Sequence, residues 1–132
     1  MPSFRVETPR HCYSAVVERG LLARVAEHIP SSAGRIFVIS TEDVWRHQGE
    51  ALEEGLAAVP HEVLYLPGGE DHKRLAPLEI LADKMVVRGG DRSSLILAFG
   101  GGIVNDMAGF LAAIFMRGIP VIQIPTTLLA QV

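Results

Sequence analysis

The sequence predicts an α/β fold built on a doubly wound, mostly parallel sheet with helices on both faces. Strand-like and helix-like patterns alternate along the whole chain. The connections between them are short, and several strand-like runs are continuously apolar, as expected of strands that are buried on both sides. No repeat or low-complexity tract interrupts the pattern, so residues 1–132 are expected to form one domain.

The first half of the chain contains three strand-like segments, each bounded by turn or capping residues. A loosely alternating run at 13–18 precedes a helical pattern at 21–29, which Pro30 ends. The β-branched and aromatic run at 36–39 predicts a buried strand, and Ser40 or Thr41 is the expected N-cap of a helix from Glu42 to about Val59. A third strand is expected at 62–66.

The second half repeats this alternation around two glycine-rich loops. A helix is expected at 75–87, a continuously apolar strand at 95–99, a second helix at 104–116 and a strand at 121–124. Thr126 and Thr127 then resemble the cap of another helix. Because the sequence stops after an apolar run without residues that close a helix, we expect the domain to be truncated at its C-terminal end.

Composition excludes several classes of protein. The chain is 48% hydrophobic and 20% charged with a net charge of −3, which gives no electrostatic reason to expect a nucleic-acid partner. No apolar stretch is long enough to cross a membrane, and no leader sequence is recognisable. The single cysteine, Cys12, cannot form an internal disulfide, so a cytoplasmic location is expected. The five histidines have no metal-ligand spacing, and we assign no metal ligand in this chain.

The junction between the fourth strand and its helix carries three consecutive glycines, Gly100, Gly101 and Gly102. Bare backbone there can approach a diphosphate, and the helix N-terminus that follows offers free N–H groups and a positive dipole end. A tight structural turn explains a glycine triplet equally well. Asp106 is expected in the first turn of that helix, where its carboxylate could accept hydrogen bonds from ribose hydroxyls or simply complement the dipole.

Other candidate ligand residues follow neighbouring strands of the predicted sheet. The loop that contains Gly69, Glu70 and Lys73 combines flexibility with an acid and a base, although a solvated helix start has the same composition. Thr126 and Thr127 offer hydroxyl groups that can bind a ligand or cap a helix. In such Rossmann-like sheets, ligands bind beyond the carboxyl ends of the strands.

Taken in order, four motifs resemble those of the 3-dehydroquinate synthases, a family of sugar phosphate cyclases. They are PGGEDHK at 67–73, GGGIVNDMAGF at 100–110, RG at 117–118 and QIPTTLLAQV at 123–132. The resemblance implies that NAD is bound by Gly69, Glu70, Lys73, Gly101, Gly102, Ile103, Asp106, Thr126, Thr127 and Leu129. It also implies that Arg117 contacts the substrate phosphate of a neighbouring subunit in a homodimer.

The resemblance further implies a NAD-dependent carbon–oxygen lyase of the shikimate pathway of aromatic amino acid biosynthesis. Such an enzyme converts 3-deoxy-D-arabino-heptulosonate 7-phosphate to 3-dehydroquinate and phosphate with a divalent metal, zinc or cobalt. The metal ligands and catalytic residues of the family belong to a helical C-terminal domain that is absent from this chain, so the fragment alone is expected to be inactive. No catalytic residue is assigned within it.

Two positions depart from the family pattern. Asn105 stands where the family usually has glycine, and we expect it to be tolerated because asparagine can adopt a left-handed conformation. Thr41 stands where members often carry Asp or Asn for the adenosine ribose, which leaves that contact open.

Three alternative functions remain. One is another sugar phosphate cyclase, such as a deoxyinosose or valiolone synthase, and another is a glycerol or iron-dependent alcohol dehydrogenase. The dehydrogenases typically have lysine where Gly109 stands, and a TGSE run where Leu128 begins a different sequence. A non-catalytic nucleotide-binding module is the alternative from a different class.

Overall fold

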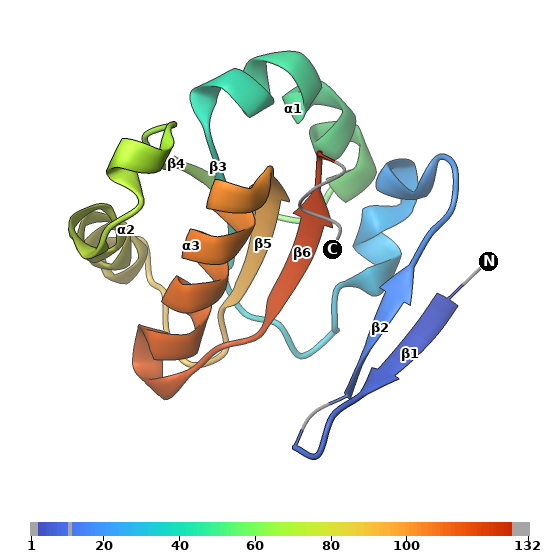
Figure 1. The fold of residues 1–132 in the computed structure, drawn as a ribbon. Helices are drawn as coiled ribbons and strands as arrows, with labels where there is room; N and C mark the ends of the chain where they lie inside the picture. Colours follow the sequence, from blue (N-terminus) through green and yellow to red (C-terminus); the bar gives the residue numbers. More distant parts are fainter. Residues whose placement is uncertain (1–2, 11, 128–132) are drawn as a thin grey trace.

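The computed structural model describes residues 3–10 and 12–127. Its main feature is a parallel sheet of four strands in the order β4-β3-β5-β6, with helices on both faces (Figure 1). The strands are β3 (Ile36–Ser40), β4 (Glu62–Tyr65), β5 (Leu95–Gly100) and β6 (Val121–Pro125). The predicted fold class is therefore confirmed.

The strands of the sheet are buried on both sides, which explains their continuously apolar sequences. Alternate residues of β3 belong to two separate cores. Phe37 and Ile39 pack in one core with α2 (Leu75–Val87) and α3 (Gly102–Ile114), whereas Ile36 and Val38 pack in the other with α1 (Glu42–Leu56) and η1 (Leu21–His28). The period of two along each strand thus separates the two helical layers.

The N-terminal segment differs from the prediction. The strand expected at 13–18 is β2 (Cys12–Val16), and it pairs antiparallel with β1 (Ser3–Glu7), which was not predicted, in a separate two-stranded sheet. Figure 1 shows this hairpin on the side of η1, away from α2. Phe4 and Val6 do alternate with polar residues in β1 and Pro9 marks the turn, so a hairpin signal was present.

The predicted helices form, and all except α2 have shifted ends. Residues 21–28 make a 3-10 helix whose backbone departs from helical angles at Arg24, consistent with the poor hydrogen-bond geometry that limits uninterrupted 3-10 runs to about four residues. Helix α1 ends at Leu56, before Ala57 with its positive φ of 51°. Helix α2 has the predicted bounds. Helix α3 starts two residues earlier than predicted, since glycine is tolerated at a first helical position, whose N–H makes no bond within the helix.

Candidate functional site

The strand order creates a topological switch point between β3 and β5. The chain leaves β3 through α1 on one face of the sheet and leaves β5 through α3 on the other face. The ends of these two strands are joined by a buried hydrogen bond in which Ser40 Oγ donates to the Phe99 carbonyl at 2.7 Å. Connections that diverge in this way leave a crevice beyond the carboxyl ends of the strands, where doubly wound proteins bind ligands.

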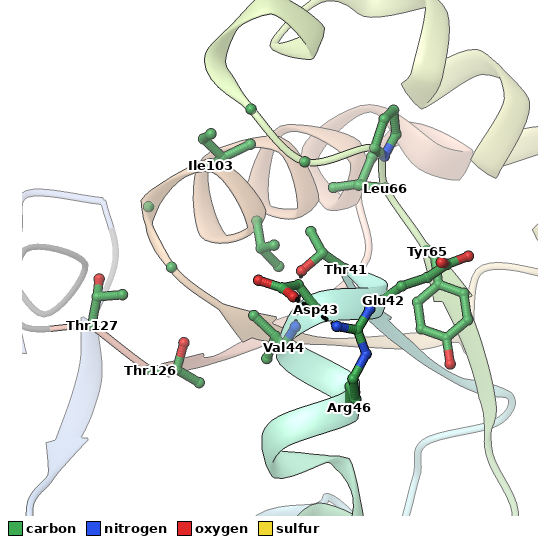
Figure 2. A pocket seen from close by; sticks show the side chains of 16 residues that line it. Thr41, Glu42, Asp43, Val44, Arg46, Tyr65, Leu66, Ile103, Thr126 and Thr127 are labelled. Atoms are coloured by element: carbon green, nitrogen blue, oxygen red, sulfur yellow. Dashed lines mark hydrogen bonds and ion pairs between the residues drawn. The ribbon is translucent and has the colours of Figure 1, made fainter.

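A groove of about 710 Å³ occupies this crevice, within the size range of small-molecule sites. Figure 2 shows Thr41 and Val44 at the start of α1, Ile103 at the start of α3, and Thr126 beyond the end of β6, arranged around the groove. The described residues that line it are Thr41, Glu42, Asp43, Val44, Arg46, Tyr65, Leu66, Pro67, Gly68, Gly69, Gly101, Gly102, Ile103, Val104, Thr126 and Thr127.

The N-terminus of α3 is the part of the groove best suited to an anion. Its N-cap is Gly101, which supplies no side-chain cap, and the first turn contains no acidic residue. The positive end of the helix dipole is therefore not complemented by the helix itself, which favours binding of a phosphate group there. A Cβ atom added at Gly102 would meet no atom of the described residues within 4 Å apart from its chain neighbours and the backbone of its own helix, and Gly102 does not have a positive φ. Among the described residues, neither packing nor backbone conformation requires glycine at this position, whereas close approach of a ligand would require it.

The N-terminus of α1 lies in the same groove and has the opposite character. Thr41 Oγ1 accepts a hydrogen bond from the Val44 N–H at 3.3 Å, so the predicted capping role is confirmed for Thr41. Glu42 and Asp43 place two carboxylates in the first turn, and Arg46 Nη1 pairs with Asp43 at 3.4 Å. This helix complements its own dipole and presents acceptors, which suit ribose hydroxyls better than phosphate.

The loop after β4 contacts α3 through an ion pair. Gly69 has a φ of 96°, a conformation that favours glycine, and lines the groove beside Gly68. The next residues form η2 (Glu70–His72), and Lys73 Nζ then donates to Asp106 Oδ2 at 2.8 Å. Two residues that the sequence proposed separately are thus brought together beside the groove.

The structure gathers most of the predicted cofactor residues but not all of them. Those that line the groove are Gly69, Gly101, Gly102, Ile103, Thr126 and Thr127. Lys73 and Asp106 pair next to it. The side chain of Glu70 and the whole of Leu129 lie outside what the structure describes.

Two expectations at this site were wrong. Asp106 was expected in the first turn of its helix, but α3 starts at Gly102, so Asp106 is its fifth residue and lies in the second turn. Asn105 was expected to be tolerated through a left-handed conformation, but it is buried inside α3, and the described non-glycine residues with positive φ are Ala57, Met116 and Arg117. Its side chain instead bonds to the glycine loop.

Arg117 lies at the other end of α3 from the groove. It ends the short helix η3 (Phe115–Arg117), and both Met116 and Arg117 have positive φ values, of 49° and 69°. The thirteen residues of α3 separate it from Gly102 by roughly 20 Å. This exposed side chain is therefore not part of the groove of its own chain.

Several groove residues were missed by sequence reasoning, namely Asp43, Val44, Arg46 and Tyr65. Their positions follow from the pairing of β3 with β5, which brings the start of α1 to the switch point. No local sequence pattern encodes the strand order. Two signals pointed to this connection, namely the Ser-Thr cap after a buried strand and the family resemblance, which places Thr41 where members often contact the adenosine ribose.

No group of three or more His, Cys, Asp or Glu side chains within residues 3–10 and 12–127 is placed to hold a metal ion. Nor does any helix in that part of the chain have the length and apolar character needed to cross a membrane.

Comparison with known proteins gives consistent matches. The family profile described as 3-dehydroquinate synthase N-terminal matches residues 63–132. The 3-dehydroquinate synthase of Solibacter usitatus is 64% identical over 132 residues, and this chain spans 37% of its length.

Solved structures of sugar phosphate cyclases share the fold. A 2-deoxy-scyllo-inosose synthase solved with carbaglucose-6-phosphate, NAD+ and Co2+ superimposes with a TM-score of 0.89 at 27% identity, over 98% of this chain and 36% of that one. A 2-epi-5-epi-valiolone synthase from Streptomyces hygroscopicus with NAD+ and Zn2+ bound has a TM-score of 0.73 at 32% identity, over 94% of this chain and 35% of its own. With more than half of its residues matched by the family profile, this chain belongs to the 3-dehydroquinate synthase N-terminal family.

Proposed function

We propose that this chain is the NAD-binding part of an enzyme that converts 3-deoxy-D-arabino-heptulosonate 7-phosphate to 3-dehydroquinate and phosphate. The observation that carries the proposal is Gly102, whose missing side chain leaves open space at an uncomplemented helix N-terminus in the switch-point groove. A dinucleotide fits this arrangement because its diphosphate needs bare N–H groups and its riboses need acceptors on either side.

The residues of the groove divide the recognition of NAD among them. Gly101, Gly102 and Ile103 supply backbone N–H groups for the diphosphate. Thr126 and Thr127 contribute hydroxyl groups from the end of β6, and Asp106 accepts from a ribose hydroxyl while Lys73 holds its carboxylate. Gly69, Glu70 and Leu129 complete the proposed cofactor set.

When bound, NAD supplies the hydride chemistry of the reaction, and the protein provides binding and orientation. The groove holds the dinucleotide at the sheet edge, and Arg117 reaches the substrate phosphate of a neighbouring subunit in a homodimer. Its guanidinium can bind a phosphate through two parallel hydrogen bonds. Its distance from the groove of its own chain supports this assignment to a partner.

A divalent metal, zinc or cobalt, is part of the proposed whole enzyme. The described residues hold no suitable cluster. We propose that its ligands lie in the part of the relatives' length that this chain does not span, so that residues 1–132 alone bind NAD without catalysing turnover.

Phosphate release tests the proposed activity. The natural gene product that carries this sequence would be assayed with 3-deoxy-D-arabino-heptulosonate 7-phosphate, with and without added NAD and after chelation of metals. Release that requires both NAD and metal is the expected result. No release from folded protein loaded with NAD and metal would contradict the proposal.

A second cyclase activity is favoured by one finding, the close superposition on 2-deoxy-scyllo-inosose synthase. In that case the substrate would be a hexose 6-phosphate, the class that carbaglucose-6-phosphate mimics. Phosphate release from a hexose 6-phosphate, and none from the heptulosonate phosphate, would support this activity. Binding of NAD with no release from either substrate would point to a non-catalytic nucleotide-binding module.

A further inference from the structure

The side chain of Asn105 makes two hydrogen bonds to the glycine loop from inside the protein. It is only 5% exposed, and its Nδ2 donates to the Gly100 carbonyl at 2.8 Å and to the Gly101 carbonyl at 2.9 Å. These two acceptors fix the orientation of the amide, because a flipped amide would place Oδ1 against both carbonyl oxygens. Asn105 is thus hydrogen-bonded to the two peptide groups that lead into α3.

These bonds determine where the opposite sides of the two peptide groups point. A trans peptide directs its C=O and N–H in opposite directions, and no cis peptide occurs in the described chain. The Gly100 carbonyl also accepts from the Thr126 N–H at 2.9 Å, and the Gly101 carbonyl from the Asn105 N–H at 3.0 Å. With both carbonyls held inward, the N–H groups of Gly101 and Gly102 are turned away from Asn105.

No side chain of the loop itself can impose this orientation. The three residues 100–102 are glycines, and a Cβ at Gly102 would meet nothing within 4 Å in the described part of the chain outside its own helix backbone. The contact of Gly101 on the groove side is the Thr127 side chain, whose Cγ2 would lie 3.2 Å from an added Cβ. A run of glycines without restraint loses much conformational entropy when it becomes ordered around a ligand.

We propose that Asn105 is a positioning residue that preorganises the N–H groups of Gly101 and Gly102 for the diphosphate of the cofactor. The inference rests on the proposed function, because it assumes that a diphosphate binds at this loop. Asn105 does not contact the ligand. It acts by holding the two peptide groups in their binding orientation before the ligand arrives.

The environment of Asn105 Oδ1 supports a role that depends on the Nδ2 donor. Oδ1 is buried and has no hydrogen-bond partner among the described residues. An unsatisfied buried acceptor is unfavourable for folding, so the amide is a poor choice for stability alone. Removal of the side chain should therefore change ligand binding more than it changes the thermal stability of the fold.

The test is calorimetric titration of the natural gene product with NAD, ADP and adenosine. Asn105→Gly is expected to bind NAD and ADP about tenfold more weakly, the scale of one lost hydrogen bond. Affinity for adenosine, which has no phosphate, should stay within about twofold. The NAD and ADP affinities of Asn105→Ser should lie between those of the wild type and Asn105→Gly, because the serine hydroxyl can still donate to the Gly101 carbonyl four residues earlier.

A control variant separates positioning from general destabilisation. Ser94 is also buried, lies near the opposite end of β5, and its Oγ accepts from the Asp91 N–H at 2.9 Å. Ser94→Ala should lower thermal stability at least as much as Asn105→Gly and leave NAD and ADP affinities unchanged.

The outcomes distinguish the two proposals. Wild-type affinity for ADP in both Asn105 variants would overturn the inference alone, as would equal losses for ADP and adenosine. A folded wild-type protein that binds neither NAD nor ADP would overturn the proposed function and this inference with it.

Discussion

Glycines occur at both edges of the parallel sheet, but their surroundings differ. At the carboxyl edge, a Cβ added at Gly68 or Gly102 would meet no other part of the described chain within 4 Å. At the amino edge, an added Cβ at Gly34 would lie 2.0 Å from Ser93 Oγ, and one at Gly90 would lie 2.7 Å from the Met85 carbonyl oxygen. Packing therefore requires glycine at Gly34 and Gly90, and also at Gly100, where an added Cβ would lie 2.7 Å from Val104 Cγ2. Gly68 and Gly102 differ, because their backbone is accessible in the groove.

Polar groups show the same contrast. At the amino edge, Asp91 accepts from the N–H and the hydroxyl of Ser93 at 2.8 and 2.6 Å, and His61 pairs with Glu53 at 2.9 Å. At the carboxyl edge, the first turn of α3 has neither a side-chain cap nor an acid. The polar groups named at the amino edge are thus paired within the protein, whereas the N-terminus of α3 has no side-chain complement in its own first turn.

Gly102→Val gives the largest expected effect on binding. The valine side chain fits the fold, because the space is open, but it fills the approach to the helix N-terminus. Affinity for NAD should fall roughly 100- to 1,000-fold, while the free energy of unfolding changes by less than about 1 kcal/mol. Calorimetry and urea denaturation measure the two quantities. An unchanged affinity would show that the ligand does not approach Gly102.

Arg117→Ala tests the proposed functional residue at the amino edge. If the guanidinium binds the substrate phosphate of a neighbouring subunit, kcat/KM for phosphate release should fall about 100-fold with NAD affinity unchanged. Mixed dimers of Arg117→Ala and Gly102→Val subunits should regain activity at one of their two sites. Full activity of the Arg117→Ala enzyme would contradict the proposed contact of Arg117 with the substrate phosphate.

Gly90→Ala should have the opposite effects to those expected of Gly102→Val, with a loss of stability and no loss of NAD affinity. The added methyl group meets backbone oxygen, which cannot move as a flexible side chain can, so the free energy of unfolding should fall by about 2–3 kcal/mol. NAD affinity of the folded fraction should be unchanged. Urea denaturation monitored by circular dichroism measures the loss, and a neutral result would show that the amino edge tolerates side chains.

Asp106→Ala is expected to have a smaller effect, again on binding. Its ion pair with Lys73 is substantially exposed, so loss of the pair should cost less than about 1 kcal/mol of stability. Loss of a ribose acceptor should weaken NAD binding about tenfold. Glu27→Ala, in an exposed ion pair of η1 that does not line the groove, serves as a control for the loss of one negative charge. Equal effects of the two variants would mean that only net charge matters.

The smallest expected effect is a pH dependence of stability from the amino edge. Burial alone would lower the pKa of His61, but hydrogen bonds to the Val59 carbonyl and Glu53, together with the Glu53 charge, raise it above its usual 6.5. A raised pKa stabilises the folded state fully below about pH 6.5, and this contribution is lost as pH rises through the raised value. Because Glu53 is half exposed, the change should stay below about 1 kcal/mol.

Urea denaturation at several pH values checks this effect, with Glu53→Gln as the comparison. The variant should lose most of the decline in stability above pH 6.5. The same decline in both proteins would assign it to another group.

Local sequence patterns were sufficient for much of this fold. The bounds of α2 follow from its apolar spacing between two glycine-containing loops. The strand predicted at 36–39 follows from its apolar, β-branched run, and in the structure it extends to Ser40. The contacts between distant segments could not be derived in this way. The pairing of β3 with β5 depends on packing in the cores on both faces of the sheet. This pairing brings Thr41 to the groove that the glycine loop also lines.

The candidate site was predicted in part for the same reason. Glycine-rich loops after strands identified Gly69 and Gly101, because such loops are local features. The hydrogen bonds donated by Asn105 could not be predicted, because they depend on where the folded loop places its carbonyl groups. The start of α3 at Gly102 was missed because glycine has a low intrinsic helix propensity.

Amide hydrogen exchange with and without NAD reports on both edges of the sheet in one experiment. We expect NAD to slow exchange in residues 67–69 and 101–104, while exchange in residues 88–94 at the amino edge stays unchanged. Protection at the amino edge, or no protection at the glycine loops of a protein that binds NAD, would contradict this expectation.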